Sequence, residues 1–188
     1  MAGELFVVSG PSGVGKGTLL AQVLPRLDNI QLSISATTRA PRAGEIDGRE
    51  YFFLTDAEFD ELVRSDGLLE WAKVHTARYG TPKAPVLEAL SQGLDEILEI
   101  DPQGALQVRS RYPQAHLIFI QPPSLEILAA RLRLRGTESS EQMERRLAAV
   151  NQEMAQREHY DKVVVNDDLA RAAAELHNYI LQMRAQKK

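Results

Sequence analysis

A lysine behind a glycine-rich turn is the feature of this chain with the clearest chemistry. Residues Gly10–Lys16, with the sequence GPSGVGK, follow the apolar run Leu5–Val8 and precede a helical pattern that starts near Thr18. A strand, a glycine-rich turn and a helix in this order form the setting of a phosphate-binding loop. The glycines let backbone N–H groups point at anionic oxygens, the helix N-terminus adds the positive end of a dipole, and Lys16 adds a full charge. We therefore expect a site for a nucleoside di- or triphosphate, rather than an ordinary glycine turn.

Gly17 departs from the phosphate-loop motif G-x-x-x-x-G-K-[ST], which has a hydroxyl residue directly after the lysine. Thr18, one position later, can still offer its N–H and its hydroxyl group to phosphate. A magnesium ion would then depend more on phosphate oxygens and water, which suits its reluctance to dehydrate. The sequence leaves the metal ligands unknown.

The composition restricts the classes of protein to which the chain can belong. Its 188 residues fit one domain, or a core with inserted subdomains, and 44% hydrophobic with 26% charged residues is ordinary for a globular protein. The absence of cysteine excludes disulfides, thiolate catalysis and cysteine-ligated zinc. A net charge of −4 argues against general nucleic-acid binding. Since we find neither a signal-peptide pattern nor a membrane-spanning stretch, we expect a cytoplasmic protein that binds neither membranes nor nucleic acid.

Short apolar runs alternate with helical patterns along the chain. This alternation predicts an α/β fold with a mostly parallel sheet flanked by helices. The last helical pattern, Leu169–Met183, is amphipathic. The apolar runs are Leu5–Val8, Ile97–Ile100, Leu117–Ile120 and Val163–Val165.

Capping residues indicate where further helices begin. Thr55–Glu58 has the pattern of a capping box, and Ser139–Gln142 is a plausible second one. Thr81, which precedes a proline, is expected at the N-cap of a helix that stops at Gly93.

Two segments interrupt the alternation of strands and helices. Within residues 33–79, short polar strands at 33–38 and 50–54 surround a single helix, which predicts a small α+β insertion. The second segment, residues 124–149, is rich in arginine.

Arg39 and Arg42 lie three residues apart around a proline turn. Two guanidinium groups that converge from a rigid turn would clamp a phosphate through charge-assisted, bidentate hydrogen bonds. A solvated basic loop is the alternative. The hydroxyl groups of Tyr51, Tyr79 and Thr81 favour the phosphate clamp, although a tyrosine such as Tyr51 more often serves packing.

Glu70 is an isolated carboxylate within the same insertion. A carboxylate that accepts from N1–H and the 2-amino group of guanine discriminates against adenine, which has no such pair of donors. The alternative is an acid on the surface at the end of a helix.

Glu99 and Asp101 follow an apolar run, where open α/β sheets place ligand chemistry. A carboxylate at this place can hold magnesium through water or orient a substrate group; it can also simply cap the junction between strand and loop. Gln103 and Gly104 are expected to form a turn toward the next helix.

The arginines of the second segment form a stripe. Arg131 and Arg135 are four residues apart and hence on one helix face, and Arg145 and Arg146 return on a following helix. Such a hairpin could fold over a triphosphate and neutralise charge during phosphoryl transfer. A solvated helix paired with neighbouring glutamates is the alternative.

Taken together and in this order, these motifs resemble those of guanylate kinases, from near the N-terminus to about residue 183. The segments that carry the resemblance are Ser9–Lys16, Ser35–Glu45, Gly48–Phe53, Glu70–Trp71, Tyr79–Thr81, Ile100–Asp101, Arg135–Thr137 and Val165–Asp168.

The resemblance implies a phosphate-loop core of residues 1–32, 83–124 and 150–188, a GMP-binding insertion of residues 33–82 and a lid of residues 125–149. It implies an enzyme that transfers the γ-phosphoryl group of ATP to GMP, giving ADP and GDP, with Mg²⁺ as cofactor, in purine nucleotide metabolism and GMP recycling. No obligate protein partner is expected.

The resemblance also assigns roles to individual residues. Catalytic roles fall to Lys16, Arg39, Arg131, Arg135 and Arg146. The residues that would bind ATP are Gly10, Pro11, Ser12, Gly13, Val14, Gly15, Lys16, Gly17 and Thr18. Asn166 and Asp167 would lie next to adenine. The GMP phosphate would be held by Ser35, Arg39, Arg42, Tyr51 and Tyr79, and guanine would be read by Glu70, Thr81 and Asp101.

Three other functions remain open from the sequence. The first is a guanylate-kinase-like module that binds a protein partner without catalysis, which the intact Lys16 and glycine loop oppose. The second is a kinase for another monophosphate such as AMP, which Glu70, Thr81 and Asp101 oppose. The third is a GTPase switch, which the missing Asn-Lys-x-Asp segment weakens.

Overall fold

The structure is a computed structural model that describes residues 2–74, 76–134, 148 and 150–186. The chain divides into two compact units. The first unit comprises the N-terminal residues up to Leu5, Asn29–Leu98 and Gln103–Ala115; the second comprises Phe6–Asp28, Glu99–Pro102 and the chain from His116 onward.

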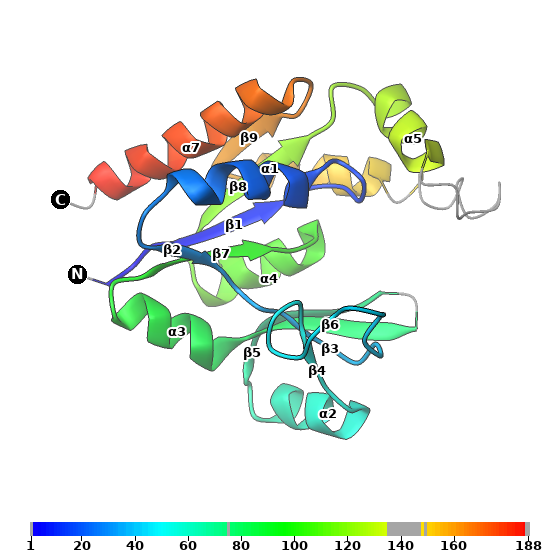
Figure 1. Ribbon diagram of the computed structural model, residues 1–188, viewed down its shortest axis with the longest axis vertical. Coiled ribbons are helices and arrows are strands. Elements are labelled where there is room, and N and C mark those ends of the chain that lie inside the picture. The colour runs from blue at the N-terminus through cyan, green and yellow to red at the C-terminus, as the bar shows by residue number, and fades with distance from the viewer. Residues whose placement is uncertain (1, 75, 135–147, 149, 187–188) are drawn as a thin grey trace. The chain divides into compact units, whose positions relative to one another are not determined.

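In the second unit, parallel strands carry the phosphate loop (Figure 1). β1 (Leu5–Ser9) pairs with β8 (His116–Gln121), and β8 pairs with β9 (Lys162–Val165), with Phe6 opposite His116 and Ile118 opposite Lys162. Both faces of β1 are buried, as expected of a parallel strand covered by helices on either side. Its helices include α1 (Lys16–Val23), η1 (Leu24–Arg26), α5 (Leu125–Leu134), η2 (Gln156–His159) and α7 (Leu169–Gln186), and residues 150–155 are also helical.

The helices α1 and α7 of the second unit lie side by side. The apolar stripe of α7 is buried, with Ala172, Leu176 and Ile180 at 0% exposure. Burial of this stripe explains the amphipathic pattern from which a C-terminal helix was predicted.

The first unit contains a parallel strand pair and a separate four-stranded sheet. β2 (Ile30–Leu32) pairs with β7 (Asp95–Glu99), and Gln31 lies opposite Glu96. The four-stranded sheet has the order β4-β3-β6-β5, with β6 antiparallel to both β3 and β5 and β4 parallel to β3. These strands are β3 (Ala36–Thr37), β4 (Phe52–Phe53), β5 (Leu68–Val74) and β6 (Ala77–Pro82), and the helices are α2 (Asp56–Arg64), α3 (Lys83–Ser91) and α4 (Pro102–Arg111).

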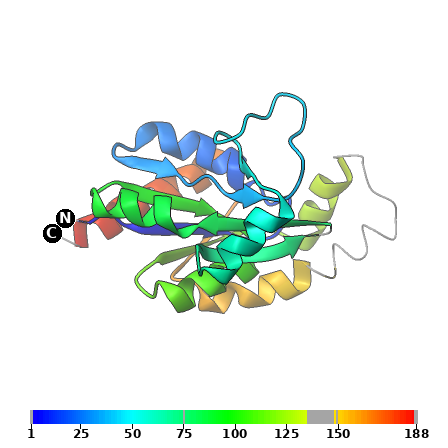
Figure 2. The same ribbon diagram turned by 90° about the horizontal axis from the view of Figure 1, so that it is seen from below.

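Helix α2 covers one face of the four-stranded sheet (Figure 2). Its Phe59 is fully buried and packs in a small core with Ala36 of β3 and Leu68 of β5. This core holds the short strands β3 and β4 in place, because two-residue strands form too few hydrogen bonds to persist by themselves.

The predicted α/β class, its mostly parallel strands and the capping box are confirmed. At the box, Thr55 Oγ1 accepts from the Glu58 amide, and Glu58 accepts from the Thr55 amide. The four apolar runs all coincide with strands. The second predicted box, Ser139–Gln142, lies outside the described residues.

Two predictions of local structure are wrong. Thr81 is not the N-cap of α3: it belongs to β6, and Pro82 occupies the N-cap without a side-chain capping bond. Gln103 and Gly104 do not form a turn, because α4 already begins at Pro102. The predicted stop at Gly93 is confirmed: α3 ends at Ser91, and Gly93 has a φ of +84°.

Within the described ranges, no helix has the length and apolar character needed to cross a membrane.

Candidate nucleotide-binding site

The phosphate loop has a positive φ at three glycines, Gly10, Gly13 and Gly15, and at two of them the space also excludes a side chain. Gly10 has a φ of +142°, and a Cβ atom there would lie 2.3 Å from the carbonyl oxygen of Ile120. Gly15 has a φ of +95°, and its Cβ would lie 2.9 Å from Nδ2 of Asn166. Both positions therefore exclude a side chain by conformation and by space. The loop is held against β8 and against the end of β9.

Asn166 holds the phosphate loop in place. Its side chain is 6% exposed, and Nδ2 donates a hydrogen bond of 2.8 Å to the carbonyl oxygen of Val14. Its own amide donates to the carbonyl oxygen of Gln121 at 2.8 Å. The adjacent Asp167 is exposed and forms an ion pair with Arg171, which lowers the pKa of the Asp167 carboxyl. The sequence predicted Asn166 only as a neighbour of adenine. It did not predict the hydrogen bond from Asn166 to the carbonyl oxygen of Val14.

Lys16 folds back over the loop. Its Nζ donates to the carbonyl oxygens of Gly10 at 2.7 Å and of Pro11 at 3.4 Å. Burial lowers the pKa of Lys16, and the charges of Glu99, Glu153 and Asp101 oppose that change. An anionic ligand would add to the opposing charges and favour the protonated amine.

Glu99 contacts the residue at which the loop departs from the motif. The Gly17 amide donates a hydrogen bond to the Glu99 carboxylate, and a Cβ atom built on Gly17 would lie 3.4 Å from Glu99 Oε2. Burial raises the pKa of Glu99, whereas the charge of Lys16 lowers it. Thr18 is exposed in the first turn of α1. Within the described ranges, no group of three or more His, Asp or Glu side chains forms a ready metal cage.

Tyr160 was not predicted to belong to this region. Its hydroxyl group donates to Ser9 Oγ at 3.1 Å, at the end of β1, and its ring packs edge-on against Phe119. Burial raises the pKa of Tyr160 to about 12, with Asp101 as one of the contributing charges. No local pattern around Tyr160 indicated that it would meet a serine 151 residues away.

In the first unit, Arg39 is bound by an acid from its own loop. Nη1 donates to Glu45 Oε2 at 2.9 Å and Nη2 to Oε1 at 3.0 Å, and Nη1 also donates to the carbonyl oxygen of Ala40. A guanidinium has five N–H donors, and these bonds use three of them. Arg42 is exposed, and its backbone amide donates to Glu45 Oε2 at 2.7 Å. Glu45 thus ties Arg39 to the backbone of Arg42.

Two tyrosines surround Arg39. Its guanidinium carbon lies 5.5 Å from the centre of the Tyr51 ring, and its side chain is hydrogen-bonded to Tyr79. The rings of Tyr51 and Tyr79 are 5.9 Å apart and nearly perpendicular. Ser35, also expected here, begins the approach to β3, and its carbonyl oxygen accepts from the Phe52 amide. The structure therefore brings together Arg39, Tyr51 and Tyr79.

Glu70 and Thr81 form a buried pair on neighbouring strands. They are 4% and 1% exposed, and Thr81 Oγ1 donates to Glu70 Oε1 at 2.7 Å. Gly104 lies against the same carboxylate, because a Cβ atom there would be 2.5 Å from Glu70 Oε2. The surface acid considered for Glu70 is therefore wrong. Gly104 had not been expected near this site.

The remaining predicted residues are distributed differently. Asp101 belongs to the second unit, where its charge acts on Lys16 and Tyr160. Arg131 lies on α5, and Arg135 and Arg146 lie outside the described residues.

Comparisons with known proteins agree on one family. The family model described as guanylate kinase matches residues 2–183. The chain is 53% identical to a guanylate kinase of Gloeobacter violaceus over 95% of its own length and 87% of that protein, and 50% identical to one of Syntrophomonas wolfei over 99% and 95%. A crystal structure of guanylate kinase from Anaplasma phagocytophilum superimposes with a TM-score of 0.76 at 32% identity, covering 97% of this chain and 86% of that one.

Proposed function

The chain belongs to the guanylate kinase family of ATP-dependent phosphotransferases, which convert GMP to GDP, and on that premise we propose which of its residues perform the reaction. Its fold is that of a phosphate-loop nucleotide-binding protein.

ATP phosphates bind to the loop Gly10–Thr18. The glycine backbone leaves no side chain in the way of the phosphate oxygens, and the contact of Asn166 with Val14 fixes the loop before ligand arrives. Lys16 leaves the carbonyl oxygens of Gly10 and Pro11 and places its ammonium group on the transferring phosphoryl group. Such a preorganised charge stabilises the transition state more than the ground state, because it is aimed at the site where charge develops during the transfer.

Mg²⁺ is proposed to bind with ATP near Glu99 and Asp101. Hard carboxylate oxygens next to a phosphate site suit this ion, which keeps several of its waters. The charge attraction of Lys16 to Glu99 and Asp101 supports their nearness to the phosphates. When bound, the ion would neutralise phosphate charge; Glu99 would hold its water shell, and Gly17 keeps space beside Glu99.

GMP is proposed to bind to the first unit, and the buried carboxylate of Glu70 carries the assignment of guanine. A carboxylate has about four lone-pair positions, and Thr81 donates to one of the two oxygens of Glu70. The N1–H and 2-amino groups of guanine are two adjacent donors that match a carboxylate, whereas adenine has no such pair of donors. Asp101 is proposed as the third residue that reads guanine.

The GMP phosphate is proposed to bind to Arg39, with Tyr51, Tyr79, Ser35 and Arg42. The pair with Glu45 holds the guanidinium plane fixed, and the N–H donors that Glu45 and Ala40 do not use serve Tyr79 and phosphate. Arg131, Arg135 and Arg146 are proposed to neutralise charge on the transferring group, as the sequence predicts. Asn166 and Asp167 as neighbours of adenine, a cytoplasmic location, and function without a protein partner also stay predictions.

A coupled assay of ADP release tests the proposed choice of substrate. The purified chain is supplied with ATP, Mg²⁺ and each of GMP, dGMP, AMP, CMP and UMP. We expect kcat/KM for GMP to exceed the values for AMP, CMP and UMP by orders of magnitude, since a site built to bind a substrate's donors rejects analogues that lack them. Comparable turnover of AMP and GMP would refute the assignment of Glu70 and Thr81.

A further inference from the structure

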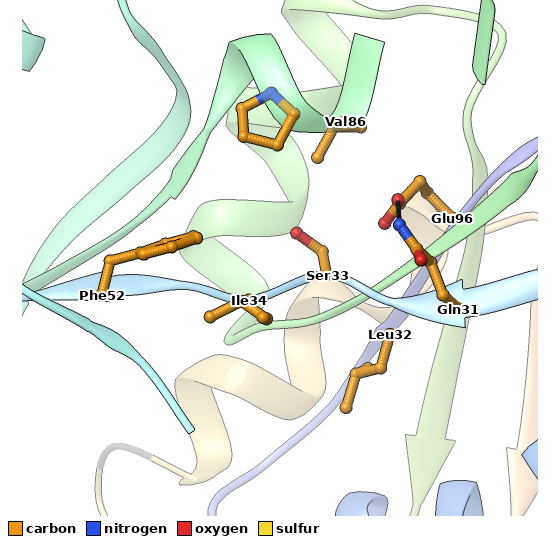
Figure 3. Close-up of a pocket in the computed structure, with 8 residues that line it drawn as sticks. Gln31, Leu32, Ser33, Ile34, Phe52, Val86 and Glu96 are labelled. Carbon is orange, nitrogen blue, oxygen red and sulfur yellow. Dashed lines mark hydrogen bonds between the residues drawn. The ribbon is translucent and has the colours of Figure 1, made fainter. Parts of the chain in front are cut away.

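The first unit contains a cavity of about 110 Å³ that none of the proposed roles uses (Figure 3). It lies between β2, the chain that follows β2, β4, α3 and β7. Its apolar lining comes from Ile34, Phe52 and Val86, and its polar lining comes from Gln31, Ser33 and Glu96. In Figure 3, Gln31 and Glu96 lie together at one side of the cavity and Phe52 at the opposite side, with Ser33 and Ile34 between them.

Glu96 brings a buried carboxylate to this cavity. The side chain is 2% exposed, and Oε1 accepts a hydrogen bond of 2.5 Å from Gln31 Nε2. Oε2 is fully buried and accepts no hydrogen bond from any described residue. A buried acceptor without a donor is destabilising, and more so if it is charged, so a group that occupies the cavity and donates to Oε2 removes that cost.

The lining supplies no positive charge to balance the carboxylate. Gln31, Ser33, Ile34, Phe52 and Val86 are all uncharged, and so are the other residues that line the cavity, Glu96 excepted. Burial raises the pKa of Glu96, and only the hydrogen bond from Gln31 opposes that change. A ligand that carries its own positive charge would therefore meet no repulsion and would favour the ionised carboxylate.

The size and opening of the cavity limit the ligand to a few heavy atoms. A single water needs roughly 10–15 Å³ of such space, so 110 Å³ holds several connected groups but no nucleotide. Gln31 is exposed at the rim, which gives a path from solvent. Val86, at 1% exposure, forms the inner apolar wall.

We propose that this cavity binds a small organic cation, a primary ammonium group on a short alkyl chain. The ammonium group donates to Glu96 Oε2, where it can also reach the hydroxyl group of Ser33. The alkyl chain packs against Ile34, Phe52 and Val86. The site is distinct from the GMP residues, although Ser33 and Ile34 directly precede Ser35 in the chain.

Titration with n-propylammonium, followed by the amide NMR signals of the cavity residues, tests this proposal. We expect saturable shifts at Ser33 and Glu96. Glu96→Gln should weaken binding by at least about tenfold, because it removes a hydrogen bond to a charged group. Glu88→Gln, which changes an exposed acid on α3, should leave binding as in the wild type. Equal binding by all three proteins, or no saturable shift, would overturn the proposal.

Two measurements on the wild-type protein distinguish binding of a cation from binding of water or neutral molecules. Propan-1-ol, which has the same chain length without a charge, should bind at least about tenfold more weakly. Affinity for n-propylammonium should rise from pH 5 to pH 8, because Glu96 must lose its proton and its pKa lies above the ordinary value. Equal affinity for the alcohol and the ammonium, or no rise with pH, would mean that the cavity holds water or neutral molecules and would contradict the proposal.

Discussion

In the second unit, Lys16 and the backbone groups proposed to bind ATP phosphates come from the single segment Gly10–Thr18, whereas in the first unit Arg39, Glu70 and Thr81 come from separate loops and strands. The phosphate loop presents backbone groups, shaped by three glycines with positive φ values and fixed by Asn166. The GMP region presents side chains, each held by another side chain.

This difference indicates a division of tasks between the two regions. Backbone N–H groups and one lysine serve any nucleoside triphosphate, because phosphates are alike. Buried side-chain acceptors distinguish one base from another, because their number and direction can match only one pattern of donors. We therefore expect changes in the loop to affect turnover and changes around Glu70 to affect the choice of nucleotide.

The largest effect is expected for Lys16→Ala. Loss of the ammonium group should lower kcat by on the order of 10²-fold or more, in line with removal of one preorganised electrostatic contact. Steady-state kinetics with saturating ATP and GMP measures this loss. Lys73→Ala, at an exposed lysine of β5, serves as the control. A Lys16→Ala protein that is folded by circular dichroism and keeps near-normal kcat would remove Lys16 from the mechanism.

Glu70→Gln should reduce kcat/KM for GMP by about 5- to 150-fold, since one buried donor of guanine loses its acceptor at a cost of roughly 1–3 kcal/mol. The amide can still accept from Thr81, so the strand pair β5–β6 is expected to remain intact. Glu61→Gln, at an exposed position of α2, is the matched control. An unchanged kcat/KM would show that Glu70 does not read the base.

Gly104→Ala tests the same carboxylate from its other side. The new Cβ atom would lie 2.5 Å from Glu70 Oε2, and the flexible carboxylate is the atom group that must move. We expect kcat/KM for GMP to fall by at least about fivefold, comparable to the loss of one buried hydrogen bond. Because alanine is favoured over glycine in helices, stability to urea should not fall. Gln103→Ala, at the preceding residue of α4, is the control. A normal kcat/KM in Gly104→Ala would contradict the placement of Glu70.

Glu45→Gln should have the smallest effect. The amide loses one of the two bonds to Arg39, so KM for GMP should rise roughly two- to fivefold while kcat stays near the wild-type value. A fall in KM would mean that Glu45 competes with the GMP phosphate for Arg39 instead of positioning it.

The phosphate loop could be predicted from sequence because its determinants are contiguous. The glycine spacing and Lys16 lie within a few residues, and the flanking strand and helix have strong patterns of their own. The same holds for the capping box at Thr55, where the two partners are three residues apart. Such features depend on local backbone geometry alone.

The environment of Glu70 could not be predicted, because distant parts of the chain create it. Thr81 and its proline have the local pattern of a helix start, but pairing of β6 with β5 extends the strand through Thr81. Gly104 resembled a turn glycine, yet it lies in a helix where the carboxylate of Glu70 excludes a side chain. Asn166 and Tyr160 likewise act on residues more than a hundred positions away.

Equilibrium binding of GMP without ATP, measured by calorimetry on the wild type, Lys16→Ala and Glu70→Gln, tests the division of tasks most directly. We predict that Lys16→Ala binds GMP within about twofold of the wild type, and that Glu70→Gln binds it about 5- to 150-fold more weakly. Equal weakening in both variants, or undiminished binding by Glu70→Gln, would contradict the account.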